Sequence, residues 1–99
     1  MKLNYELSKL ALADIDNIWQ YTFKNWSKTQ ANEYYKDIFK EIEIICENPE
    51  IGKSIKDIKP NHRIQLIKSH IIVYKVLEAK IYIDRILHKR MDIQNILSK

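Results

Sequence analysis

The chain is poor in glycine, proline and cysteine, with one, two and one of these among its 99 residues. A single glycine excludes a glycine-rich phosphate loop, which needs glycine at several fixed positions. So little glycine and proline also leaves no stretch with the composition of a flexible linker. The lone Cys46 excludes an internal disulfide and agrees with a reducing cytoplasm. We therefore expect one cytoplasmic domain spanning residues 1–99.

Long apolar runs and paired metal ligands are also lacking. No run approaches the roughly 18 apolar residues of a membrane span, and the opening MKLNYELSKLALAD carries acids, unlike a signal peptide. His62, His70 and His88 lie on separate predicted strands, while Cys46 lies in a predicted helix, so none has the spacing of a zinc site. We expect no membrane segment, no metal and no cofactor.

What the chain does contain is positive charge. Its formal net charge is +4, and 30% of its residues are charged. Such a balance favours acidic partners, which include RNA, DNA and acidic proteins. The basic residues are spread along the chain without a dense polybasic stretch, so charge alone does not choose among these partners.

The first half predicts a strand followed by two helices. Residues 3–7 alternate apolar and polar side chains, which is typical of a strand. Ser8 can cap a helix that runs to about Trp26, and Ser27 starts a capping box for a second helix that ends near Asn48, before a proline. The side chains that recur at helical spacing are Ala11, Ile15, Ile18, Trp19, Thr22 and Trp26, then Ala31, Tyr34, Tyr35, Ile38, Phe39, Ile42, Ile45 and Cys46.

The second half predicts a three-stranded meander. After a loop over residues 49–61, the period changes to two, giving strands His62–Ile67, His70–Leu77 and Lys80–His88 joined by two-residue turns. Such short turns force antiparallel neighbours. Asp92 can cap a last helical turn, residues 93–97. The predicted fold is α+β, in the order β-α-α-β-β-β, with the helix hairpin packed on an antiparallel sheet and a short C-terminal helical tail.

The basic residues near the last strand permit two interpretations. A metal-free ribonuclease needs a base, an acid and cations for the phosphorane, and Arg63, Arg85 and His88 with Lys89 and Arg90 are of these types. Alternatively, Arg85 pairs with an acid, His88 forms a hydrogen bond at a strand end, and the other cations are solvated. Spacing alone favours the second interpretation without excluding the first.

The aromatic residues also permit more than one interpretation. We expect Trp19 and Trp26 to lie in the core. Tyr21, Tyr34 and Tyr35 exceed what two helices can bury against a sheet, so they either line a groove for a partner or pack internally. His70, at the start of the middle strand, is expected to be a hydrogen-bonded strand-end residue rather than a catalytic one.

Taken in order along nearly the whole chain, these short motifs resemble those of one family. They are Tyr5-Glu6-Leu7-Ser8, Ala11, Ala13-Asp14-Ile15, Ile18-Trp19-Gln20-Tyr21-Thr22, Trp26-Ser27, Gln30-Ala31, Tyr34-Tyr35, Asn48-Pro49, Gly52, Ser69-His70-Ile71-Ile72-Val73-Tyr74, Arg85-Ile86-Leu87-His88 and Arg90-Met91-Asp92. The sequence resembles the ParE toxins of the RelE/ParE superfamily, the toxin halves of bacterial type II toxin–antitoxin pairs.

The resemblance implies an inhibitor of DNA gyrase that acts by binding, without a catalytic set. RelE-like relatives instead cleave mRNA on the ribosome, and the shared fold does not separate the two activities. The end of the last strand has no tyrosine after His88, which resembles the gyrase-directed branch. On this view His88, Lys89 and Arg90 are target-binding candidates. The alternative is a ribosome-dependent endoribonuclease using Arg63, Arg85 and His88.

The resemblance also implies a partner, a ParD-like antitoxin that is acidic and partly disordered until it binds. We expect an antitoxin helix to lie across the hairpin and the sheet edge, near Trp26, Tyr34 and Tyr35. Such a pair stabilises a plasmid or a chromosomal region. Neither direct sequence-specific DNA binding nor membrane association is expected.

Overall fold

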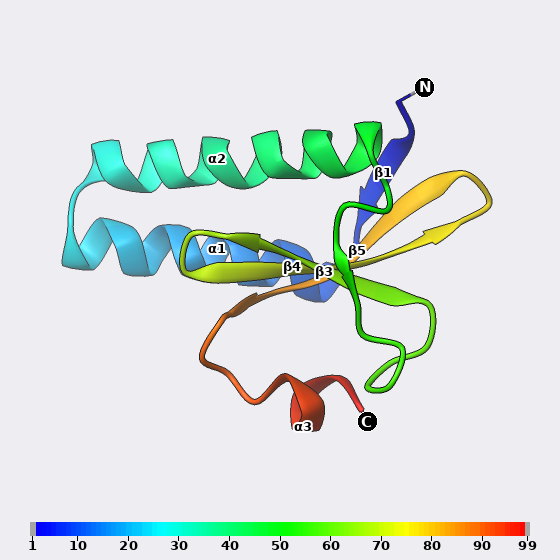
Figure 1. Ribbon diagram of the computed structural model, residues 1–99. Helices are drawn as coiled ribbons and strands as arrows, with labels where there is room; N and C mark the ends of the chain where they lie inside the picture. Colours follow the sequence, from blue (N-terminus) through cyan, green and yellow to red (C-terminus); the bar gives the residue numbers. More distant parts are fainter. Residues whose placement is uncertain (1, 99) are drawn as a thin grey trace.

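Two long helices lie on one face of a five-stranded sheet, and a short helix lies on the other face (Figure 1). The computed structural model describes residues 2–98. The elements in chain order are β1 (Asn4–Leu7), α1 (Lys9–Asn25), α2 (Lys28–Glu47), β2 (Lys53–Ser54), β3 (His62–Ile67), β4 (His70–Leu77), β5 (Lys80–His88) and α3 (Ile93–Leu97). The predicted α+β class is confirmed, and so is the predicted order of elements apart from the added β2.

Serine caps explain where the hairpin helices begin. The Ser8 hydroxyl accepts a hydrogen bond from the Ala11 amide at 3.0 Å, and the Ser27 hydroxyl accepts one from the Gln30 amide at 3.0 Å. Each bond satisfies an amide that has no partner within its own helix. Only Trp26 and Ser27 separate α1 from α2, so the two helices return alongside each other as an antiparallel hairpin.

The sheet has the order β1-β5-β4-β3-β2. The expected meander of β3, β4 and β5 is antiparallel, with the predicted strand ends. Two features differ from the expectation of an antiparallel sheet. First, β1 pairs in parallel with β5, because the helix hairpin separates β1 from the meander along the chain. Second, the two-residue β2 pairs with β3, although its segment was expected to be a loop.

A bulge in β5 changes which face its side chains occupy. Val73 pairs with Arg85 and Tyr74 with Ile83, so Asp84 has no residue opposite it. One extra residue moves the following side chains to the other face of the strand. The side chains on the hairpin face are therefore Ile81, Ile83 and Ile86, whereas Leu87 lies on the opposite face.

The sheet separates two hydrophobic cores. The larger core lies under the hairpin and consists of Ala11, Ile15, Ile38, Ile42, Ile45, Cys46, Ile67, Ile72, Tyr74, Ile81, Ile83 and Ile86. The smaller core lies beneath α3 and the loop after α2 and consists of Ile55, Ile71, Val73, Leu87 and Leu97. β4 is central and contributes to both cores. Over residues 2–98, no helix combines the length and apolar character needed to cross a membrane.

Contrary to expectation, the two tryptophans do not lie in the core. Trp26 is 68% exposed, because it ends α1 at the tip of the hairpin, which extends past the β3–β4 turn (Figure 1). Trp19 is partly exposed, stacks on Phe23 with ring centroids 5.3 Å apart, and donates a hydrogen bond to the Asn32 side chain at 3.0 Å. The helical period identifies one face of α1 but not where the sheet beneath it ends.

Candidate binding groove

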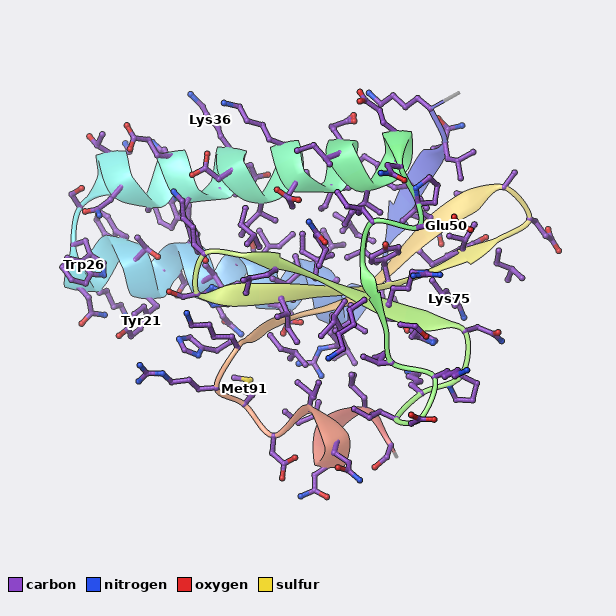
Figure 2. All side chains as sticks on the ribbon, in the orientation of Figure 1. Tyr21, Trp26, Lys36, Glu50, Lys75 and Met91 are labelled. Carbon is purple, nitrogen blue, oxygen red and sulfur yellow. The ribbon has the colours of Figure 1, made fainter. Side chains whose placement is uncertain are left out.

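A groove of about 890 Å³ lies between the outer half of the hairpin and the end of the meander. We refer to it as the hairpin groove. Its lining residues are Asn17, Ile18, Tyr21, Thr22, Trp26, Gln30, Glu33 and Tyr34 on the hairpin side, and Lys68, Ser69, His70, His88, Arg90 and Met91 on the sheet side. Figure 2 shows Tyr21 and Trp26 at the hairpin tip and Met91 on the segment that follows β5.

Tyr34 and His70 connect the two walls of the groove. The Tyr34 hydroxyl lies 2.6 Å from His70 Nδ1 and 3.2 Å from the Ile67 carbonyl oxygen. Burial, and then the neighbouring His88, lower the pKa of His70 from 6.5 to about 4. Burial also raises the pKa of the Tyr34 hydroxyl. At neutral pH both side chains are therefore uncharged, and they contribute hydrogen bonds rather than charge to the groove.

His88 lies beside His70 because the two residues pair across β4 and β5. Their rings meet edge to face with centroids 5.2 Å apart. His88 Nδ1 accepts a hydrogen bond from the Arg90 amide at 3.1 Å, and the Lys89 amide donates to the Ser69 carbonyl at 2.9 Å. These bonds fix the segment after β5 as one wall of the groove.

Two cations line the sheet side of the groove. Lys68 donates to Asp37 at 2.6 Å and lies 5.7 Å from the centre of the Tyr34 ring. Arg90 is exposed, as is its neighbour Lys89, and neither forms an ion pair with the residues described. The Lys89 and Arg90 side chains are consequently available to an external anion.

The nuclease candidates do not lie together. Arg63 donates to the Gly52 carbonyl at 2.7 Å and so anchors the loop that carries β2. Arg63 lies four residues before Ile67 on β3, and Ile67 pairs with His70 on β4. Four residues of strand place Arg63 about 13 Å from the groove end of β3. Of the three candidates, only His88 lines the groove.

Arg85 joins α1 to β5 instead of facing the groove. Its guanidinium donates to both carboxylate oxygens of Asp14, through Nε at 2.8 Å and Nη2 at 3.0 Å. Asp14 also accepts a hydrogen bond from the Ile86 amide at 2.9 Å. The hydrogen bonds from Arg85 to the Asp14 carboxylate raise the pKa of the Arg85 guanidinium. The geometry agrees with the interpretation in which Arg85 pairs with an acid.

The third histidine belongs to a separate structural cluster. His62 is 5% exposed; its Nδ1 lies 2.7 Å from the Pro60 carbonyl and its Nε2 2.5 Å from Asp84, which also lies 3.5 Å from Lys59. This cluster holds the loop before β3 against the bulge in β5. Across residues 2–98, no three His, Cys, Asp or Glu side chains are placed to hold one metal ion.

The three antitoxin candidates are divided between two surfaces. Trp26 and Tyr34 line the hairpin groove, whereas Tyr35 packs against Phe39 at 4.9 Å on the outer side of the hairpin. Met91, Lys68 and His70 also line the groove, although none of them was predicted to belong to a binding site. Helical spacing did contain a signal for the hairpin wall, since Asn17 and Tyr21 are four residues apart on α1, and Gln30 and Tyr34 are four residues apart on α2.

Fold and groove together define a small α+β protein in which a helix hairpin and a mixed sheet enclose one large groove. Residues 5–93 match the family described as "ParE toxin of type II toxin-antitoxin system, parDE". Curated relatives include Toxin ParE1 of Mycobacterium tuberculosis (strain CDC 1551 / Oshkosh), 35% identical over 94% of this chain and 96% of the relative. Toxin ParE1 of Caulobacter vibrioides is 34% identical over 89% of this chain and 91% of the relative.

Among solved structures, one described as "Chromosomal ParDE TA system from P. aeruginosa" superposes with a TM-score of 0.77 at 18% identity. The match covers 88% of this chain and 96% of that chain, and it shows the shared fold. The chain belongs to the ParE toxin family, and its class is the toxin of a type II toxin–antitoxin system.

Proposed function

We propose that this toxin inhibits DNA gyrase by binding it in the cytoplasm, without breaking a bond itself. The observation that carries the proposal is the dispersal of the ribonuclease candidates. Arg63 bonds to the Gly52 carbonyl and Arg85 to Asp14, so neither cation accompanies His88 at the groove. General acid–base cleavage of RNA needs these groups within hydrogen-bonding reach of one phosphate.

The proposed surface for gyrase is the end of β5 with the residues that follow it. His88, Lys89 and Arg90 lie next to one another, and both cations are exposed. Exposed charges of this kind accelerate association and set its dependence on salt more than they set affinity.

The proposed antitoxin is ParD-like, and its helix lies in the hairpin groove against Trp26 and Tyr34. The hairpin side of the groove is an aromatic wall formed by Tyr21, Trp26 and Tyr34, and the sheet side is a cationic wall formed by Lys68 and Arg90. These walls suit an amphipathic, acidic helix. A segment that folds only on binding is compatible with this arrangement. The antitoxin would then cover the residues next to the gyrase surface and so neutralise the toxin.

The test of the target uses two purified systems in parallel. One contains gyrase with relaxed plasmid, and the other contains ribosomes with mRNA. We expect loss of supercoiling, intact mRNA, and little change in either readout for His88→Gln, because an amide can replace one imidazole hydrogen bond. Ribosome-dependent cleavage that His88→Gln lowers by about 100-fold or more, with supercoiling unaffected, would instead establish the ribonuclease.

The surface assignment is tested by charge reversal. Lys89→Glu and Arg90→Glu should weaken gyrase inhibition, with a larger effect at low salt. Lys36→Glu is the matched control, because it makes the same charge change on α2, on the side away from the groove (Figure 2). Equal losses for all three variants would show that only net charge matters.

The antitoxin assignment is tested by co-purification with the product of the neighbouring gene. Trp26→Ala should lose antitoxin affinity, whereas Tyr35→Ala should retain more of it, because Tyr35 does not line the groove. The reverse order would move the antitoxin to the outer face of the hairpin. A neighbouring product that leaves the toxin unbound at micromolar concentration would refute the pairing.

A further inference from the structure

We propose that the hairpin groove binds a single strand of DNA, with its bases against Tyr21 and Trp26 and its backbone along Lys68 and Arg90. This inference rests on the proposed function and extends it, because an enzyme that cuts and rejoins DNA is a source of unpaired strand segments. It assigns to the toxin a direct, sequence-independent contact with nucleic acid.

The hairpin side of the groove presents two exposed aromatic rings. Tyr21 and Trp26 are 65% and 68% exposed, although both rings lie at the mouth of a groove. Large exposed aromatic rings grouped in this way mark a binding surface more often than chance packing. Any base can stack on such a ring, because every base has a π-face.

The sheet side of the groove presents two cations, Lys68 and Arg90. Arg90 is exposed and can place its planar guanidinium against a phosphate. Lys68 is held by Asp37, but this ion pair is at the surface, with the lysine side chain 64% exposed, so a phosphate can compete for it at little cost. A backbone along this wall and bases toward the hairpin match the chemistry of both walls.

The remaining lining residues favour a single strand without sequence preference. Asn17 and Gln30 offer amide groups on the hairpin side, and an amide can donate to or accept from any base edge. Among the lining residues, the two cations Lys68 and Arg90 outnumber the one acid, Glu33, so the groove favours an anionic ligand. A duplex stacks its bases on one another, so Tyr21 and Trp26 could not stack on them.

The binding assay uses Trp26 as its own reporter. The chain has two tryptophans, so Trp19→Phe leaves Trp26 as the only one. We expect an oligothymidylate of about ten nucleotides to quench its fluorescence saturably, with affinity falling as salt rises, by about 0.7 in the logarithmic slope per phosphate contact. Circular dichroism of each variant checks that it is folded.

Two variants with the same charge change locate the strand. In the Trp19→Phe background, Arg90→Glu should weaken binding by about tenfold or more, while Lys36→Glu on the outer side of α2 should change it by less than about threefold. A third variant, Tyr21→Ala, tests stacking without changing charge and should weaken binding at every salt concentration. If Lys36→Glu weakens binding as much as Arg90→Glu, attraction is non-specific and the inference fails.

Two further outcomes would overturn the inference, and neither depends on gyrase. They are the absence of quenching at oligothymidylate concentrations far above micromolar, and tighter binding of oligouridylate RNA than of oligothymidylate. The supercoiling assay is scored separately. Inhibition of gyrase by a toxin that does not bind oligothymidylate would retain the proposed function and remove only the DNA contact.

Discussion

At the scale of single residues, the groove contains an imidazole that stays neutral when the protein is folded. His70 is held against the Tyr34 hydroxyl and the His88 ring, and burial is the main cause of its low pKa. A histidine in this state can accept or donate a hydrogen bond at neutral pH but carries no charge. His70 therefore adds no positive charge to the groove, whereas Lys68 and Arg90 do.

His70 should make stability fall in acid. Its pKa is about 4 in the folded protein and about 6.5 in the unfolded chain, so between these values the unfolded state binds the proton more tightly. The contribution of the neutral His70 side chain to the free energy of unfolding is constant above about pH 6.5 and is lost as the pH falls toward 4. Allowing for the partial exposure of the ring, we expect a loss of about 1–2 kcal/mol. Urea unfolding at several pH values measures it.

Since carboxylates also titrate in this range, the control is His70→Gln, which lacks the ionisable group. The slope of unfolding free energy against pH between about 5 and 6.5 should be smaller for this variant than for the parent. Identical slopes would show that the pKa of His70 is the same in the folded and unfolded states.

Arg85 illustrates how a residue of catalytic type serves the fold. Arg85→Ala should lower the free energy of unfolding by about 2–4 kcal/mol, because it leaves the Asp14 carboxylate, which is 13% exposed, without its cation. Arg85→Lys should lose less, since it keeps the charge but not the two-point geometry. Denaturant titration measures both, with activity expressed per folded molecule.

The control is Lys80→Ala, also in β5, which breaks the exposed pair with Glu6 and should cost less than about 1 kcal/mol. If Arg85→Ala folded as stably as the parent but lost all toxicity, Arg85 would have a functional role that the Asp14 pair does not explain.

At the scale of elements, the scarcity of glycine leaves other residues in left-handed backbone positions. Glu78 and Ala79 form the turn between β4 and β5 with φ values of 52° and 61°. Such values suit a two-residue hairpin turn but disfavour residues with a Cβ, by roughly 1–2 kcal/mol each. Asparagine followed by glycine is the preferred pair for this turn.

The double substitution Glu78→Asn, Ala79→Gly should therefore stabilise the protein by about 1 kcal/mol, after the greater freedom of glycine in the unfolded chain is included. The expected rise in melting temperature is about 4–8 °C. Ala13→Gly, at an exposed position within α1, should instead lower stability by about 1 kcal/mol. A double variant that is less stable than the parent would show that Glu78 makes a compensating contact.

The sequence predicted elements with strong local signals better than it predicted pairing. The serine caps gave the starts of both long helices, and two-residue turns gave the ends of β3, β4 and β5. β2 has only two residues and therefore no periodicity to detect. The bulge at Asp84 was also hidden, because a strand with apolar side chains on both faces does not show a change of face.

The groove was predictable only in part, because it depends on how distant segments are arranged in space. Tyr21 and Tyr34 were identified as surplus aromatic residues, and His88 and Arg90 as target-binding candidates, whereas Trp26 was expected in the core and was an antitoxin-binding candidate only through the family resemblance. That they line one groove depends on how far the hairpin extends past the β3–β4 turn and on the pairing of His70 with His88. Both are tertiary properties that no local pattern encodes.

At the scale of the whole molecule, the two cores support different parts of the surface. The core beneath the hairpin fixes the helical wall of the groove. The opposite wall follows β5 and leads directly into α3, a five-residue helix that packs through Leu97 on the other face of the sheet. The position of Arg90 and Met91 thus depends on contacts made on the side of the sheet away from the groove.

This arrangement predicts a remote effect on binding. Leu97 is 4% exposed and does not line the groove, yet Leu97→Ala should cost about 2–3 kcal/mol and promote local undocking of α3. Molecules in which α3 is undocked lose the groove wall, so apparent affinity for the antitoxin or oligothymidylate should fall roughly threefold or more. Hydrogen exchange should show faster exchange in α3 than in α2.

Leu66→Ala is the control, because Leu66 is 58% exposed on β3 and outside the groove, and its stability should change by less than about 0.5 kcal/mol. Binding by this variant should be unchanged. If Leu97→Ala destabilised the protein but bound both ligands with the parent's affinity, the segment after β5 would hold its position through its bonds to His88 and Ser69 alone. α3 would then serve the smaller core without shaping the groove.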